Sequence, residues 1–146
     1  MRLPDDMERV FVDTSVLIWA FNYPESNSAT IVKMITKRKL HGITSQKAIE
    51  EMELVLTGEY DSSIFYKAKK QVLYFFQVIP RERISGEMEK WRGKIKEKDL
   101  EHLATAKALG IRVLLAVDRD FEPFQEYMTP KEFLKARGFE ANETDY

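Results

Sequence analysis

Short hydrophobic runs alternate with longer amphipathic stretches along the chain. Arg112–Val117 is hydrophobic without alternation, which is typical of a strand buried on both faces. The runs that predict strands are Val10–Val12, Gly42–Thr44, Gln77–Ile79 and Arg112–Val117.

Between these runs, apolar residues recur at helical spacing. Ser45 precedes one such stretch as an N-cap residue, and Thr129, Pro130 and Glu132 form the start pattern of the last one. We expect helices over Thr14–Phe21, Ala29–Leu40, Gln46–Thr57, Asp61–Phe76, Glu87–Lys96, Asp99–Leu109 and Phe133–Arg137.

This alternation predicts an α/β fold. A crossover between two parallel strands must pass over the sheet, so helices are expected on both of its faces. The expected architecture is a three-layer α/β/α arrangement with a central, mostly parallel sheet. The chain has 146 residues, of which 44% are hydrophobic and 32% charged, and it shows no repeat or linker. One domain spanning residues 1–146 is therefore predicted.

Charge and composition narrow the possible chemistry. Lys and Arg number 23 against 24 Asp and Glu, so any contact with nucleic acid must be local. There is no cysteine and there are two histidines, so a metal site would consist mainly of carboxylates. No hydrophobic run approaches the ~20 residues of a membrane span, and the first ten residues lack the pattern of a signal peptide. We expect a cytoplasmic protein without membrane contact.

Four acidic residues occupy positions suited to a shared site. Asp13 and Asp118 each follow a predicted strand, and the carboxyl ends of parallel strands meet at one edge of the sheet. Glu51 and Asp99 lie on predicted helices. Each also has an ordinary explanation, because Asp13, Asp118 and Asp99 are acceptable helix caps and Glu51 could be solvated like Glu50. The pattern alone therefore allows two interpretations: a shared cluster of carboxylates, or separate capping and solvated residues.

Five segments resemble the PIN domain family, in particular ribonucleases of the VapC type from toxin–antitoxin pairs. They are VFVDTS (10–15), SQKAIEEMELVL (45–56), DLEHLATA (99–106), VDRDF (117–121) and TPKEFL (129–134), which together span nearly the whole chain. They follow one another in the family's order and on the expected elements. The resemblance implies a PIN-like version of the α/β/α fold.

The resemblance also implies a site and an activity. It assigns Asp13, Glu51, Asp99 and Asp118 as catalytic residues and metal ligands, with Asp120 as a further ligand and Ser15 as a hydrogen-bonding companion. Oxygen ligands of this kind favour Mg²⁺ or Mn²⁺. The implied reaction is hydrolysis of RNA to 5′-phosphate and 3′-hydroxyl ends. We hypothesise that Asp13 and Asp118 bind metal most directly, while Glu51 and Asp99 complete the ligand set or hold the attacking water.

Partners follow from the same resemblance: an RNA substrate, an antitoxin protein and a second copy of the chain in a homodimer. One departure concerns Ala116, where the family often has Ser or Thr two positions before the fourth acid. This departure keeps open a non-catalytic PIN-like module that binds RNA or protein. A haloacid-dehalogenase-like phosphotransfer domain is a further alternative, although Asp13-Thr-Ser15 lacks the second Asp of that nucleophile motif.

The stretch from Lys67 to Lys98 is rich in cations and carries aromatic residues such as Trp91. Such a stretch can bind RNA by phosphate contacts and base stacking. Interleaved glutamates favour a solvated, ion-paired face instead. His102 is expected at a helix surface or partly buried, without a role as a base.

Overall fold

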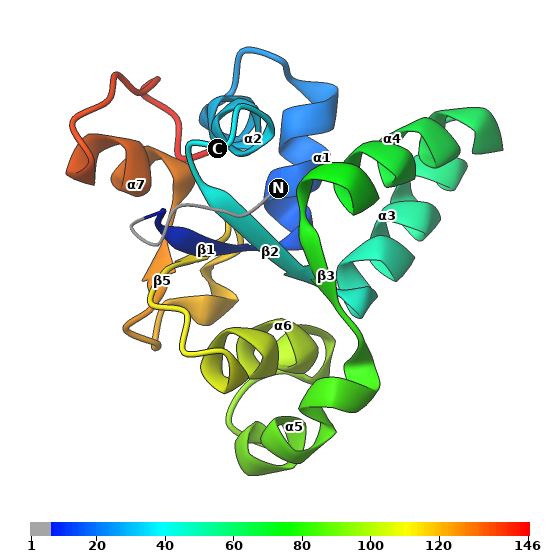
Figure 1. The fold of residues 1–146 in the computed structure, drawn as a ribbon, viewed down its shortest axis with the longest axis vertical. Coiled ribbons are helices and arrows are strands. Elements are labelled where there is room, and N and C mark those ends of the chain that lie inside the picture. The colour runs from blue at the N-terminus through cyan, green and yellow to red at the C-terminus, as the bar shows by residue number, and fades with distance from the viewer. Residues whose placement is uncertain (1–6) are drawn as a thin grey trace.

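The computed structural model describes residues 7–146, and its centre is a parallel sheet (Figure 1). Every neighbouring pair of strands is parallel, in the order β3-β2-β1-β4-β5. The strands are β1 Arg9–Val12, β2 His41–Ser45, β3 Gln77–Ile79, β4 Leu114–Leu115 and β5 Tyr127–Met128. The predicted α/β class with a parallel sheet is confirmed.

Helices connect the strands and cover both faces of the sheet. They are α1 Thr14–Asn22, α2 Asn27–Thr36, α3 Gln46–Glu59, α4 Ser62–Phe75, α5 Ser85–Trp91, α6 Glu97–Ala108 and α7 Pro130–Ala136, with 3₁₀ turns η1 Arg81–Ile84 and η2 Arg119–Phe121. The predicted capping box of Thr129 and Glu132 opens α7. Among these described helices, none has the length and apolar character needed to cross a bilayer.

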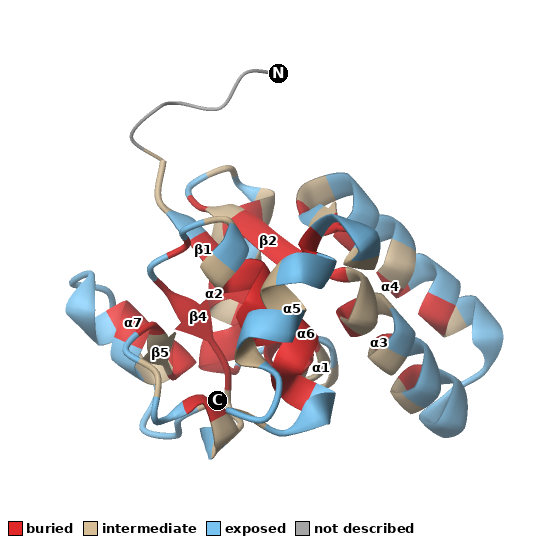
Figure 2. Cartoon of the chain, turned by 90° about the horizontal axis from the view of Figure 1, so that it is seen from below, coloured by how far each residue is buried: buried red, intermediate tan, exposed pale blue. Residues whose placement is uncertain are grey.

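Alternate residues of the central strands supply two separate cores. Val10 and Val12 pack toward α1, α2, α3, α4 and α7, whereas Phe11 packs toward α5 and α6. Successive side chains of a strand point to opposite faces, so this division makes the three layers of the fold. Figure 2 shows β1, β2, β4 and α6 as the buried centre, while the α3–α4 pair presents exposed faces. The predicted three-layer architecture is confirmed.

The last part of the sheet differs from the prediction. The strand expected over Arg112–Val117 pairs regularly only at Leu114–Leu115. Additional backbone hydrogen bonds, such as Ala116 N–H to Met128 O at 3.2 Å, continue the contact beyond the strand. The short strand β5 was not predicted, because two residues carry no periodicity and the strand exists only through its pairing with β4.

The helix expected over Glu87–Lys96 is also displaced. Residues Arg81–Ile84 form η1 first, and α5 then ends at Trp91. The chain leaves the helix at Arg92, and Gly93 follows in a left-handed conformation with φ of 86°. A helix ending at this point frees Lys96 and the start of α6 to approach the sheet edge.

Candidate carboxylate site

All four acids predicted from the sequence line one cavity at the carboxyl edge of the sheet. The cavity measures about 270 Å³. Four parts of the chain form its wall: the β1–α1 junction, α3, the start of α6 and the segment after β4. The lining residues are Asp13, Thr14, Ser15, Ile18, Trp19, Glu51, Val55, Lys98, Asp99 and Asp118. Asp120 does not line the cavity but contacts Lys98 at its rim. The fold thus brings together side chains that are about a hundred residues apart in the sequence.

Asp13 is held at the junction of β1 and α1. Its carboxylate caps α1, where Oδ2 accepts hydrogen bonds from Ser15 N–H at 3.1 Å and Ser15 Oγ–H at 2.6 Å. The same Ser15 oxygen accepts a hydrogen bond from Val117 N–H at 3.1 Å. Ser15 therefore fixes Asp13 and ties it to the segment that carries Asp118.

Asp99, Asp118 and Asp120, which we call the aspartate trio, converge at the other part of the site. Each offers an oxygen, and these oxygens lie within 4.8 Å of one another. Asp118 caps η2, with its Oδ1 accepting from Asp120 N–H at 2.9 Å. The turn after β4 thus places two of the three carboxylates.

Asp99 is the member of the aspartate trio whose surroundings are least favourable for a negative charge. Its side chain is buried, and Oδ2 accepts no hydrogen bond of acceptable geometry within the described residues. Burial raises the pKa of Asp99 to about 6, and the charge of Asp118 adds to this increase while Lys98 opposes it. A buried carboxylate oxygen without a hydrogen-bond donor is costly, so Asp99 stores free energy that a cation could release.

Lys98 places its ammonium within the aspartate trio. Its Nζ lies 3.0 Å from Asp118 Oδ2, 3.0 Å from Asp120 Oδ2 and 3.2 Å from Asp99 Oδ2. Burial alone would lower the pKa of Lys98, but hydrogen bonds to Asp118 and Asp120 raise it. Hydrogen bonds from Lys98 and Lys96 lower the pKa of Asp120. One lysine side chain is therefore the main positive charge at these three carboxylates.

The cation-rich stretch is divided between two environments. Arg92 pairs with Glu89 and Glu97, and Lys90 pairs with Glu87, as the ion-paired interpretation expects. The stretch is not uniform, however, because its last cation, Lys98, enters the site. The sequence interpretation missed this position, since nothing in the local pattern separates Lys98 from its solvated neighbours.

His102 organises the side of the site that holds Asp13 and Glu51. Its Nε2 lies 2.7 Å from Glu51 Oε1 and 3.5 Å from Asp13 Oδ1, and its Nδ1 lies 2.9 Å from Ser45 Oγ. Thr14 Oγ1–H also donates to Glu51 Oε1, at 2.7 Å. Ser45 caps α3, so the imidazole links β2, α3 and α6.

The position of His102 corrects the expectation of a surface or partly buried residue, because it is 1% exposed. Burial alone would lower the pKa of His102, but Glu51 and Asp13 raise it. Burial alone would raise the pKa of Glu51, but the hydrogen bond and charge of His102 lower it overall. The spacing of three residues from Asp99 puts both side chains on one helix face, and that spacing was the available signal.

Ala116, the position at which the sequence departs from the expected pattern, is fully buried. It belongs to the apolar cluster between the sheet and α6 and does not line the cavity. The backbone N–H of the next residue, Val117, is already bound by Ser15 Oγ. In this chain Ser15 thus supplies a hydroxyl at the end of β4.

The residues of this site fit a hard divalent cation. The donors are carboxylate oxygens, as Mg²⁺ and Mn²⁺ prefer, and no soft ligand is among them. The buried Asp99 Oδ2 lacks a hydrogen-bond donor, and the Lys98 ammonium shows that the aspartate trio accommodates positive charge. Asp13 and Glu51 line the same cavity but direct oxygens toward Ser15, Thr14 and His102. The direct role predicted for Asp13 in metal binding remains a prediction.

The fold and the site together define the class of this protein: it is an α/β/α protein with a parallel sheet and a cluster of carboxylates at the carboxyl edge of that sheet. Within that class, residues 10–126 match the PIN domain, and the chain belongs to the PIN domain family. The resemblance noted from the sequence is confirmed. A search of curated proteins gave no significant match.

Solved structures share the fold. A toxin–antitoxin complex from Klebsiella pneumoniae has a chain that is 19% identical, with a TM-score of 0.66 over 84% of this chain and 98% of that one. VapC20 of Mycobacterium tuberculosis, described as a sarcin–ricin loop cleaving toxin, is 18% identical with a TM-score of 0.61 over 91% and 98% of the two chains. VapBC2 of Rickettsia felis, bound to a promoter DNA fragment, is 13% identical with a TM-score of 0.59 over 82% and 96%. The predicted similarity to VapC structures is confirmed at the level of the fold.

Proposed function

We propose that this chain is a metal-dependent endoribonuclease that hydrolyses RNA phosphodiester bonds. The observation that carries the proposal is the meeting of Asp13, Glu51, Asp99 and Asp118 around one cavity, at whose rim oxygens of the aspartate trio lie within 4.8 Å of one another. Carboxylates this close repel one another, and a structural role would not require so many of them. The arrangement fits phosphoryl chemistry with Mg²⁺ or Mn²⁺.

The aspartate trio would hold the cation. A bound divalent ion would supply charge neutralisation at the phosphate and a more acidic water. Asp13 and Glu51 would act beside it from the same cavity. Glu51 Oε1 is occupied by Thr14 and His102, whereas no described residue donates to Oε2. The pKa of Glu51 is lowered, so this free oxygen is ionised at neutral pH and is suited to orienting a water by accepting its hydrogen bond.

RNA is the substrate class that the relatives support. VapC20, which shares the fold, is described as cleaving the sarcin–ricin loop, an RNA element. The cavity opens at the surface between α1, α3 and α6, where a flexible single-stranded phosphate could enter. We propose that water attacks the phosphorus and that the P–O3′ bond breaks with the 3′-oxygen as the leaving group, which gives products with 5′-phosphate and 3′-hydroxyl ends.

We further propose that the chain is the toxin of a toxin–antitoxin pair. One structural relative is described as a toxin–antitoxin complex, and another as VapBC2 bound to a promoter DNA fragment. An apolar cavity of about 200 Å³ lies between α1, α2 and α4, with Leu17, Val32 and Val72 in its wall. Such a cavity accepts an apolar side chain of a partner. We assign it to the antitoxin.

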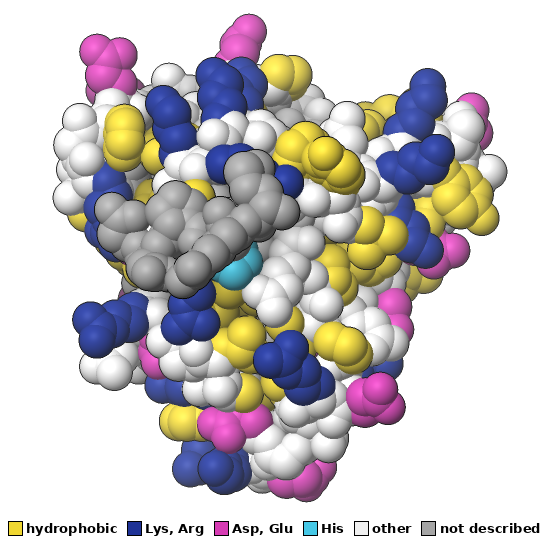
Figure 3. All heavy atoms as spheres, in the orientation of Figure 1, with side chains coloured by type: hydrophobic (Ala, Val, Ile, Leu, Met, Phe, Trp, Pro, Cys, Tyr) yellow, Lys and Arg dark blue, Asp and Glu magenta, His cyan; other side chains and the backbone are white. Residues whose placement is uncertain are grey.

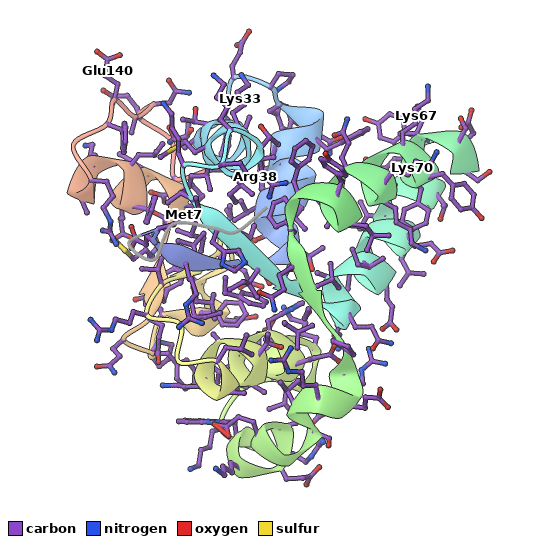
Figure 4. All side chains as sticks on the ribbon, in the orientation of Figure 1. Met7, Lys33, Arg38, Lys67, Lys70 and Glu140 are labelled. Atoms are coloured by element: carbon purple, nitrogen blue, oxygen red, sulfur yellow. The ribbon has the colours of Figure 1, made fainter. Side chains whose placement is uncertain are left out.

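The outer face of the α3–α4 pair is assigned to the homodimer. Leu54, Leu73 and Tyr74 are 76%, 52% and 73% exposed there. Figure 3 shows hydrophobic side chains beside lysines and arginines over α4, and Figure 4 shows Lys67 and Lys70 extending outward from the same helix. Light scattering of Tyr74→Asp and Leu73→Glu should give a monomer from a wild-type dimer. A dimer that survives both changes contradicts this assignment.

Cleavage of end-labelled RNA tests the activity. Purified chain is incubated with structured and unstructured RNA in Mn²⁺, in Mg²⁺ and in chelator, beside Asp118→Asn. We expect cutting that requires the metal and is lost in the variant. Cutting that persists in chelator or in Asp118→Asn contradicts the proposal. If metal raises the melting temperature but no RNA is cut, the non-catalytic PIN-like alternative is favoured.

The haloacid-dehalogenase-like alternative has no support in the geometry. That chemistry uses a second Asp two residues after the nucleophile as an acid and base. Ser15 occupies this position and donates its hydroxyl to Asp13. A hydroxyl bound in this way holds Asp13 in place and is too weak an acid to replace the carboxyl group as a general acid.

A further inference from the structure

Lys98 occupies an unusual position for a residue of a cation-binding site. It is the second residue of α6, directly before Asp99, and its Nζ lies 3.0–3.2 Å from one oxygen of each member of the aspartate trio. Its side chain is 53% exposed as a whole, so the stem runs along the surface and the ammonium turns inward. A single flexible side chain therefore neutralises part of the charge of three carboxylates.

A monovalent ammonium satisfies this group only in part. Asp99 Oδ2 is buried and accepts no well-formed hydrogen bond, although Lys98 Nζ is 3.2 Å away. Three negative charges face one inner cation, and the second lysine, Lys96, contacts only the exposed side at Asp120 Oδ1. The repulsion among the carboxylates is thus reduced but not removed.

We infer that Lys98 is a tethered counter-ion that competes with divalent cations for the aspartate trio. The ammonium and a divalent ion cannot both lie within about 3 Å of the same oxygens, since their mutual repulsion is strong at that distance. The ammonium must leave the carboxylates before a divalent ion binds there. Lys98 thereby holds the site together without metal and lowers its affinity for metal.

This inference rests on the proposed function, because it concerns the same site. It adds a regulatory role for one side chain of this protein. The metal concentration at which the aspartate trio is occupied depends on how easily the Lys98 ammonium is displaced. The exposed stem allows the withdrawal, since it is not packed in the core and has free rotatable bonds.

Mn²⁺ binding by three variants tests the inference. Free Mn²⁺ is measured by electron paramagnetic resonance at pH 7 without RNA. Lys98→Gln removes the charge and should bind Mn²⁺ at least about tenfold more tightly than wild type. Lys96→Gln removes a neighbouring charge that is 66% exposed and should change the affinity by less than about threefold. Lys98→Arg keeps the charge and should stay near wild type.

Thermal melting supplies a second readout. In chelator, Lys98→Gln should melt below wild type, because the aspartate trio loses its inner cation. Saturating Mn²⁺ should remove or reverse this difference. If wild type binds Mn²⁺ and Lys98→Gln binds it no more tightly, the inference is wrong while the proposed metal site stands. If neither protein binds Mn²⁺, the metal-dependent function and the inference are both wrong.

Discussion

Asp99→Asn should stabilise the protein when no metal is present. The pKa of Asp99 is raised to about 6 from an ordinary value near 4, chiefly by burial. Between these two pH values the folded chain holds a proton that the unfolded chain has released. Stability is therefore lost as the pH rises through this window, and at pH 7 the ionised Asp99 carries the full cost. Asparagine cannot ionise, so the variant does not have the free-energy cost of a buried negative charge.

The size of the effect follows from the shift. A difference of about 2 pKa units corresponds to ~3 kcal/mol, and solvent at the open side of the cavity reduces this to ~1–2 kcal/mol. We expect Asp99→Asn to exceed wild type by that amount at pH 7 in chelator. The difference should fall below about 1 kcal/mol at pH 4, where the folded wild type is already protonated.

Urea unfolding at pH 7 and pH 4 in chelator measures this difference. Asp120→Asn is the matched control with the opposite sign. Lys98 and Lys96 lower the pKa of Asp120, so its charge adds stability above the unfolded pKa that is lost in acid. That variant should be less stable than wild type at pH 7. Saturating Mn²⁺ should stabilise wild type more than Asp99→Asn. An Asp99→Asn protein no more stable than wild type at pH 7 would show that the ionised Asp99 does not destabilise the fold.

Three further predictions concern individual residues. Asp13→Asn should abolish RNA cleavage and leave the circular dichroism spectrum unchanged; undiminished cleavage would remove Asp13 from the site. His102→Ala should lower the free energy of unfolding by ~2–4 kcal/mol in urea, because it empties buried volume and removes the imidazole contact of the Ser45 hydroxyl, and a loss under ~1 kcal/mol would contradict that role. Gly42→Ala should cost ~1–3 kcal/mol, since its Cβ would lie 2.8 Å from Ile35 and Phe76; unchanged thermal melting would show that these side chains yield freely.

The hydrophobic pattern predicted the layers of the fold because β1 and β2 are almost completely buried. Burial on both faces favours apolar residues, which makes such strands visible in a sequence, and the buried Thr44 of β2 is satisfied by a hydrogen bond to Val12 O. The same logic located Asp13 and Asp118, since an acid directly after a buried strand core marks the sheet edge. The edge strand β5 escaped prediction, because Tyr127 and Met128 are only half-buried and depend on their pairing with β4.

The residues that surround the four predicted acids were harder to predict than the acids themselves. Lys98 lies in a run of lysines and glutamates, and local sequence does not tell which cation turns inward. His102 stands among buried neighbours on α6, so its contacts with Glu51 and Ser45 depend on the packing of α6 against α3 and β2. Asp120 was predicted only through the family resemblance, and its place beside Lys98 depends on the tight turn after β4. Long-range packing decides each of these positions.

The chemistry of the cleaved ends shows whether water or the RNA's own 2′-hydroxyl attacks the phosphate. An RNA cut by this chain in Mn²⁺ is analysed by mass spectrometry, beside the same RNA with 2′-deoxynucleotides at the cut position. Hydrolysis at a carboxylate-bound metal predicts 5′-phosphate and 3′-hydroxyl ends, and it predicts that the 2′-deoxy substrate is still cut. Cyclic 2′,3′-phosphate ends and an uncut 2′-deoxy substrate would show attack by the RNA's own hydroxyl, and they would contradict metal-dependent hydrolysis by this chain.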